Sequence, residues 1–370
     1  MKRREFLTGA AGAAAGAAAG AAAGYVAASS ESAPAHPATV RALRMVTSWP
    51  RDFPLFAASA ERLAARIVQS SGGRLAVEVR HAGEAVPPYE AFDAVSAGVA
   101  ELYHGCEAFW RAKNPAFQFF ASIPYGLGAG EFASWLAHGE GQALWDELAH
   151  GFNVKPFLAG HTGIHAGGWY TREIRGVADL RGLRLRMPDL GGEVLARLGA
   201  AIVPIPAGDI VEALKTKAID GAEWYGPAID LAFGLHRAAR VYYVPAAVDP
   251  GMALSCGINR SLWDGLDESA RAAISDACAA EAEHTHGAFL AENARAFETL
   301  VREHGVQPRR LPESVVRAVG RMAETVVREM AESDPAARKI HDSYMGFRAR
   351  AVAWSQASEW AYLGQRDQYR

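Results

Sequence analysis

The residue types best suited to binding chemistry in this 370-residue sequence lie at or near the ends of two predicted strands. Arg186 ends the segment 183–186, in which leucines alternate with arginines as in a half-buried strand. Glu223 and Trp224 end the segment that begins at Ile219. Ligands of parallel sheets bind at the carboxyl ends of the strands. We therefore expect a guanidinium, a carboxylate and an indole in one crevice, which suits a small anion with or without a cation.

The elements around these residues alternate between strands and helices. Pro188 ends the first strand, and an amphipathic helix is predicted over residues 193–199. A short apolar strand follows at 201–205, and Asp209 stands where it can cap a helix over 210–215. This alternation predicts an α/β unit with a parallel sheet.

The first part of the chain predicts a similar unit. Strands are expected at residues 43–49, 75–80 and 100–104, separated by helices at 57–70 and 89–97. This order of strands and helices predicts a first α/β lobe.

The C-terminal third is predicted to be helical. Asp267 caps a run that reaches His304, a second run covers 313–333, and a third covers 336–363. The third helix carries an apolar stripe that needs a partner surface, either on its own lobe or on a second subunit. The stripe consists of Ile340, Tyr344, Phe347, Ala351, Trp354 and Ala361.

Composition excludes several classes of protein. The formal net charge is −3 and no basic stripe occurs, which argues against a nucleic-acid partner. Cys106, Cys256 and Cys278 lack metal-binding spacing, and we expect all three to be buried and reduced. No nucleophile, zinc-hydrolase, P-loop or dinucleotide motif is present, so no catalytic residue is assigned.

The first residues read as an export signal. Arg3 and Arg4 precede Phe6 and Leu7, and an Ala/Gly-rich run continues to about residue 28. This pattern is typical of a twin-arginine signal. The run is too weakly hydrophobic for a comfortable membrane span, so we expect a cleaved leader and a periplasmic protein. The alternative is an Ala/Gly-rich tail without a targeting role.

The chain resembles the DctP family, the substrate-binding component of tripartite ATP-independent periplasmic (TRAP) transporters. The likeness is to the branch that binds 2-oxo and 2-hydroxy monocarboxylates, and it rests on the order of many short segments. They include Val46-Thr-Ser-Trp-Pro, Ala82-Gly-Glu-Ala-Val-Pro, Phe92-Asp-Ala-Val-Ser, Gly167-Gly-Trp-Tyr, the Arg186 segment, Glu223-Trp-Tyr-Gly-Pro, Leu231-Ala-Phe-Gly-Leu-His and Asp249-Pro-Gly.

The resemblance implies an α/β, two-lobed periplasmic-binding-protein fold with a ligand cleft between the lobes and a long helical C-terminal tail. The expected divisions are a signal peptide and flexible start at 1–36, a first lobe at 37–162 and a second lobe at 163–248. A return to the first lobe with a long helix is expected at 249–312, and C-terminal dimerisation helices at 313–370.

The resemblance also assigns roles to the residues of the crevice. Arg186 corresponds to the clamp on the substrate carboxylate, which a guanidinium can grip in a bidentate manner. Glu223, a carbonyl of Trp224 and Asp249 correspond to the ligands of a Ca²⁺ or Na⁺ ion that the substrate also contacts. The alternative for these residues is a structural salt-bridge network between the lobes.

Two histidines depart from the family pattern. Similar proteins carry Asn and Gln, which touch substrate and metal, at the positions of His161 and His165. A four-residue spacing suits metal binding on a helix, and the glycines around this pair indicate a strand or loop, so the pair does not predict zinc. A protonated imidazole could instead replace the cation. Trp49 and Trp110 are expected as walls of the cleft from the first lobe, with the core as their alternative.

The resemblance implies a solute-binding protein without enzymatic activity. It would capture pyruvate, lactate or a related acid and deliver it to the TRAP membrane permease, without an organic cofactor and as a homodimer. The alternatives are a periplasmic enzyme exported by the twin-arginine pathway, or a ligand sensor using the same cleft.

Overall fold

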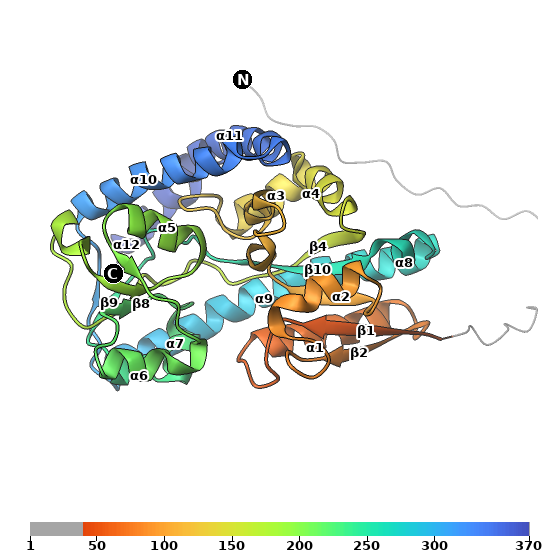
Figure 1. The fold of residues 1–370 in the computed structure, drawn as a ribbon, viewed down its shortest axis with the longest axis horizontal. Helices are drawn as coiled ribbons and strands as arrows, with labels where there is room; N and C mark the ends of the chain where they lie inside the picture. Colours follow the sequence, from red (N-terminus) through yellow and green to blue (C-terminus); the bar gives the residue numbers. More distant parts are fainter. Residues whose placement is uncertain (1–39, 370) are drawn as a thin grey trace, which may run out of the picture. The chain divides into compact units, whose positions relative to one another are not determined.

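A computed structural model describes residues 40–369 of the chain. The predicted export signal lies outside these residues. Within the described part, no helix combines the length and the apolar character needed to cross a bilayer. Two sheets with separate helices make up this part of the chain (Figure 1).

The first sheet has the strand order β2-β1-β3-β10-β4. β1 runs parallel to β2 and β3, whereas β10 runs antiparallel to β3 and β4. All seven residues of β10 are buried, which suits a strand between two others and covered on both faces. The bounds are β1 Arg41–Thr47, β2 Leu75–Arg80, β3 Leu102–Gly105, β4 Val154–His161 and β10 Ala253–Asn259.

The second sheet has the order β11-β9-β5-β8-β6-β7. Its strands are β5 Gly168–Tyr170, β6 Arg184–Arg186, β7 Ala201–Ile202, β8 Gly221–Ala222, β9 Val241–Tyr243 and β11 Pro308–Arg309.

This second sheet is mixed, which corrects the predicted parallel sheet. The strand–helix alternation correctly indicates β6, β7 and β8, which are parallel to one another. β5 is antiparallel to both β8 and β9. β5 is joined to β6, the next strand of this sheet, by residues 171–183 without the crossover α-helix that parallel strands require.

Short helices cover both sheets. On the first sheet α1 (Phe56–Ser70) buries one apolar face, which includes Leu63 and Ile67. The others are α2 Ala91–Ser96, α3 Ala129–His138, α4 Gly141–His150, α5 Asp189–Arg197, α6 Ile210–Lys215, α7 Pro227–Phe233 and α8 Arg260–Asp264. Asp209 occupies the N-cap position of α6, as expected, but its side chain makes no capping hydrogen bond.

The long helix α9 (Glu268–Arg302) passes along elements of both sheets (Figure 1). As predicted, Asp267 caps it by accepting a hydrogen bond from the Ala270 N–H at 2.7 Å. α9 contacts β4 of the first sheet, the helix α1 that covers this sheet, and α7 beside the second sheet. Glu281 is fully buried and pairs with two arginines of α1, which fastens the two helices to each other.

The tail consists of α10 (Glu313–Glu332), α11 (Pro335–Ser355), a π-helical turn at Gln356–Trp360 and α12 (Ala361–Asp367). The predicted stripe of α11 is buried in its first part and exposed in its last part. Ile340 and Tyr344 are buried within their own chain, where the Tyr344 hydroxyl accepts the Leu127 N–H at 2.7 Å. Trp354 is 72% exposed. Only the distal part of the stripe therefore needs another surface.

Candidate functional site

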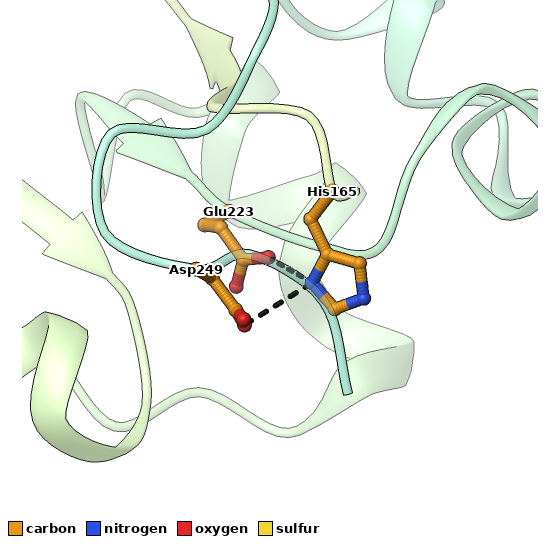
Figure 2. A group of neighbouring side chains, drawn as sticks. All are labelled: His165, Glu223 and Asp249. Carbon is orange, nitrogen blue, oxygen red and sulfur yellow. Dashed lines mark hydrogen bonds and ion pairs between the residues drawn. The ribbon is translucent and has the colours of Figure 1, made fainter. Parts of the chain in front are cut away.

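Three ionisable side chains from separate segments meet at one point. The Nδ1 atom of His165 lies 3.1 Å from Asp249 Oδ2 and 3.5 Å from Glu223 Oε1. Figure 2 shows the imidazole edge facing the two carboxylates. His165 and Glu223 are buried, and the side chain of Asp249 is 28% exposed. The three residues present one ligand atom each within a span of 4.8 Å.

Two of the three residues lie where the chain passes between the two sheets: His165 stands in the loop between β4 and β5, and Asp249 precedes β10. Glu223 follows β8 of the second sheet. A close contact of two loops holds this geometry: a Cβ atom at Gly251 would lie 1.9 Å from the Gly163 carbonyl oxygen. Gly251 also has a φ of +116°, which side chains rarely adopt, so the position requires glycine.

Hydrogen bonds to the atoms of Asp249 and His165 that do not face each other fix both side chains. Asp249 Oδ1 accepts from the Ser122 hydroxyl at 2.6 Å and from the Gly251 N–H at 3.0 Å. The Nε2 atom of His165 lies 2.7 Å from the Thr162 hydroxyl, which also accepts the Met252 N–H at 2.8 Å. The Nδ1 edge of the imidazole is thereby held toward the carboxylates.

The cluster shifts the proton affinities of its members. Burial opposes protonation of His165, but the charge and hydrogen bond of Asp249 and then the contact with Glu223 outweigh it and raise its pKa to about 10. Burial raises the pKa of Glu223, and His165 opposes this shift. For Asp249 burial is outweighed by His165, Ser122 and Gly251, so its pKa is lowered. A positive charge beside the carboxylates is therefore strongly favoured.

Glu223 keeps one unsatisfied oxygen. Its Oε1 atom is buried and has no hydrogen-bond partner among the described residues, because the 3.5 Å contact with His165 is not a hydrogen bond. A buried carboxylate oxygen without a partner is costly, which indicates that a further positive group or donor belongs here.

Arg186 lies beside this cluster at the end of β6. Its Nη1 donates to the Glu223 carbonyl oxygen at 3.2 Å, and its guanidinium lies 4.7 Å from the centroid of the Trp224 ring. No carboxylate of residues 40–369 forms a salt bridge with it. The structure thus brings Arg186 and Trp224 next to Glu223, and the guanidinium keeps donors free for a ligand.

A small cavity of about 40 Å³ adjoins the cluster. Glu223 and Asp249 contribute to its wall together with Gln118, Ser122 and Asp189. Its apolar wall includes Met187, Val248 and Met252. A cavity of this size is too small for an extended ligand, and its wall combines polar groups with an apolar side.

Asp189 and Ser122 are cavity residues to which the sequence analysis assigned no role. Asp189 is exposed as a residue, yet the protein around its carboxyl raises its pKa to about 6, a shift that Arg111 opposes. Its position just after β6, beside Arg186, was the signal that could have indicated it. Ser122 lies in a loop without a motif, so no pattern pointed to it.

The other predicted site residues lie elsewhere. Trp49 is buried and donates its indole N–H to His104 Nδ1 at 2.8 Å, and Trp110 donates to the Tyr89 carbonyl oxygen at 3.2 Å. Neither lines the cavity beside Glu223. His161 lines a separate, mainly apolar cavity of about 350 Å³ together with His286. Burial and then His286 lower the His161 pKa to about 3, so this imidazole is neutral.

Two α/β units with a charged site beside the passages of the chain between them are the arrangement of periplasmic binding proteins. Residues 45–334 match the model of the DctP family, bacterial extracellular solute-binding protein family 7, and the chain belongs to that family. The family is extracytoplasmic.

Similar proteins of known function and structure support this assignment. The monocarboxylate 2-oxoacid-binding periplasmic protein of Nostoc sp. is 34% identical over 319 residues, covering 86% of this chain and 87% of the relative. A TRAP transporter solute-binding protein of Bordetella bronchiseptica, crystallised as a mixed-occupancy dimer with calcium and picolinate, is 30% identical. Its TM-score is 0.84, with 89% of this chain and 98% of that chain covered.

A second solved structure carries a different ligand. The TRAP periplasmic solute-binding protein of Pseudoalteromonas atlantica was crystallised with sodium and pyruvate. It is 30% identical with a TM-score of 0.83, covering 88% of this chain and 99% of that chain.

Proposed function

We propose that this protein captures a small 2-oxo or 2-hydroxy monocarboxylate and delivers it, unchanged, to the membrane permease of a TRAP transporter. The observation that carries the proposal is the placement of Arg186 beside the Glu223–His165–Asp249 cluster. The guanidinium would bind the carboxylate of the ligand in a bidentate manner. A positive group held by the cluster would contact the oxygen on carbon two of the ligand.

The charges of the site call for a cation between Glu223 and Asp249. A ligand carboxylate would add a third negative group close to these two, and repulsion at such distances is substantial in a partly buried site. The residues fit an ion, because Glu223 Oε1 is buried without a hydrogen-bond partner among residues 40–369 and both carboxylates offer hard oxygen atoms. When bound, the ion would neutralise the carboxylates and attract the ligand oxygens. The two solved structures described above contain calcium and sodium, respectively.

The alternative source of positive charge is the protonated imidazole of His165. Its raised pKa of about 10 keeps the proton through neutral pH. In that case binding is strongest below the folded pKa and weakens as the pH rises through about 10. A cation-dependent site would instead lose its affinity in chelator and sodium-free buffer.

A panel of acids tests the proposed function. We expect pyruvate, lactate and longer 2-oxo acids to raise the melting temperature, while propionate, which lacks the oxygen on carbon two, has little effect. The acid recovered after incubation should be unchanged. Absence of stabilisation by every member of the panel would refute the proposal, and turnover of any member would favour the enzyme alternative.

The same assay distinguishes a bound cation from protonated His165 as the source of positive charge. The panel is repeated in EDTA and sodium-free buffer at pH 7 and pH 10. Loss of stabilisation in EDTA at pH 7 supports the cation. Retention at pH 7 with loss at pH 10 assigns the charge to His165.

Export by the twin-arginine pathway, the domain divisions given above and a homodimer complete the proposal. The division at about residues 162 and 249 is supported by the passages of the chain between the sheets, after β4 and before β10. The dimer is supported by the exposed aromatic residues of the tail. Closure of the two lobes around the ligand would give the permease a state to recognise.

A further inference from the structure

The cluster beside Arg186 contains a nitrogen donor in addition to its carboxylates. His165 Nδ1 points at the same space as Glu223 Oε1 and Asp249 Oδ2, at 3.5 and 3.1 Å (Figure 2). Calcium and sodium take oxygen ligands, whereas imidazole nitrogen suits zinc and other first-row transition metals. This residue set therefore differs chemically from an all-oxygen site.

The two separations from the imidazole nitrogen fit one small ion. Zinc ligands lie about 2.0–2.2 Å from the ion. If the ligand–zinc–ligand angle is between a right angle and the tetrahedral angle, two such ligand atoms are roughly 2.8–3.6 Å apart. The separations of 3.1 and 3.5 Å from Nδ1 to the two carboxylate oxygens fall in this range.

The surroundings of the imidazole can hold it in the metal-binding tautomer. Nε2 lies 2.7 Å from the Thr162 hydroxyl oxygen, which can accept its proton. The Thr162 hydroxyl proton has the Gly163 carbonyl oxygen at 3.3 Å as its own acceptor. Metal-binding histidines commonly donate their second N–H to such a partner, which leaves the other nitrogen free to bind the ion.

The unpartnered oxygen of Glu223 is an independent indication of a ligand. Glu223 is only 6% exposed, and its Oε1 has no hydrogen-bond partner within residues 40–369. The residue lines the cavity, so an ion bound there would satisfy this oxygen and face the space for the organic acid.

We propose that His165, Glu223 and Asp249 form a site for a borderline divalent transition metal, represented by Zn²⁺, in preference to Ca²⁺ or Na⁺. This inference rests on the proposed function for one point only: the organic acid would complete the coordination with its carboxylate and adjacent oxygen. Three protein ligands with an open position are the arrangement that lets a metal bind an external ligand.

The test measures metal binding without any organic acid. Protein stripped with chelator is titrated with Zn²⁺ and, separately, with Ca²⁺, and the stoichiometry is checked by elemental analysis. We expect one Zn²⁺ per chain, bound at least tenfold more tightly than Ca²⁺. His165→Gln supplies an oxygen in place of the nitrogen and should lose at least tenfold in Zn²⁺ affinity, with Ca²⁺ affinity unchanged or higher.

Two controls locate the ion. His161→Asn alters the histidine of the separate apolar cavity and should leave Zn²⁺ binding unchanged. Co²⁺ added to the unsubstituted protein should give visible bands of a nitrogen-ligated site that disappear on addition of Zn²⁺, a result that depends on no variant. Absence of stoichiometric Zn²⁺ binding, tighter binding of Ca²⁺, or equal Zn²⁺ affinity in His165→Gln would overturn the proposal.

A final titration separates this inference from the proposed function. Pyruvate is added to metal-free, Ca²⁺-loaded and Zn²⁺-loaded protein. Zn²⁺ binding without pyruvate binding supports the metal site and contradicts the proposed function. Pyruvate binding by a protein that binds no Zn²⁺ supports the proposed function and contradicts the metal site.

Discussion

At the scale of single residues, two arginines of one strand differ in how their charge is compensated. Arg184 is paired with Asp220 through two contacts, Nε to Oδ2 at 3.0 Å and Nη2 to Oδ1 at 2.8 Å. Arg186, two residues later on β6, contacts a carbonyl oxygen and an aromatic ring instead. Its charge is therefore available to a ligand, whereas the charge of Arg184 is already used in the fold.

We expect Arg186→Lys to lower the affinity for the bound acid at least tenfold, which corresponds to about 1.4 kcal/mol. An ammonium cannot reproduce a two-pronged contact with a carboxylate. Isothermal titration with pyruvate measures the change. Arg184→Lys is the matched control and should bind nearly as well as the unsubstituted protein; a folded Arg186→Lys protein with full affinity would remove Arg186 from the site.

Glu107 is a second residue whose chemistry depends on its place in the fold. It is fully buried in the first lobe and accepts a hydrogen bond from the Tyr103 hydroxyl at 2.8 Å. Burial raises its pKa from 4.5 to about 8 although Tyr103 and Ser255 oppose the shift. The carboxyl is thus neutral at pH 7 in the folded protein and ionised in the unfolded chain.

A raised folded pKa determines the sign of the pH dependence. The contribution of Glu107 to stability is fully present below pH 4.5 and is lost as the pH rises to about 8. We expect Glu107→Gln, which stays neutral, to become more stable relative to the unsubstituted protein across this window. Urea unfolding at several pH values measures the difference. Glu90→Gln, at an exposed position, should show no such trend.

At the scale of elements, α9 holds the two sheets in one structure. It contacts β4 and α1 on one side and α7 on the other, and its middle contains Gly287. A Cβ atom at Gly287 would meet no atom of the described part of the chain within 4 Å, and the residue is exposed. Glycine in a helix interior therefore costs stability here without serving a contact.

Gly287→Ala should raise the free energy of unfolding by roughly 0.5–1 kcal/mol, because alanine loses less conformational freedom in a helix. Denaturant unfolding monitored by circular dichroism tests this. Ala280→Gly, at an exposed position of the same helix, should lower stability by a similar amount. A destabilised Gly287→Ala protein would mean that α9 needs local flexibility at its centre.

At the scale of the whole molecule, the end of the tail presents aromatic side chains to solvent. Trp354 and Trp360 are each 72% exposed, and Tyr362 is 64% exposed. Clustered exposed apolar side chains of this size mark interaction surfaces in soluble proteins. This distal segment is the part of the chain that we expect to pack on a second subunit.

Light scattering should therefore give a dimer mass at micromolar concentration, and the double substitution Trp354→Gln with Trp360→Gln should shift it toward the monomer. Leu290→Gln is the control, since Leu290 is 69% exposed and belongs to α9 instead of the tail. A monomeric unsubstituted protein would contradict the proposed dimer, as would a double variant that remains fully dimeric.

The sequence by itself determined the local structure and the residue types of the site. The amphipathic period of α1, the cap Asp267 and the strand that ends at Arg186 could all be predicted, since each depends on neighbours within a few residues. Glu223, His165 and Asp249 could be named as candidates because their segments resemble a family.

Only the tertiary structure decided which of these candidates meet. It separates His161 from His165, although they are four residues apart, because the loop turns at Gly163: His161 lines the apolar cavity, whereas His165 joins Glu223 and Asp249. It buries Ile340 and Tyr344 within one subunit while Trp354 stays exposed. It also orients His165 Nδ1 toward two carboxylates from segments more than 50 residues away in sequence. Such contacts depend on the packing of distant segments, which no local pattern encodes.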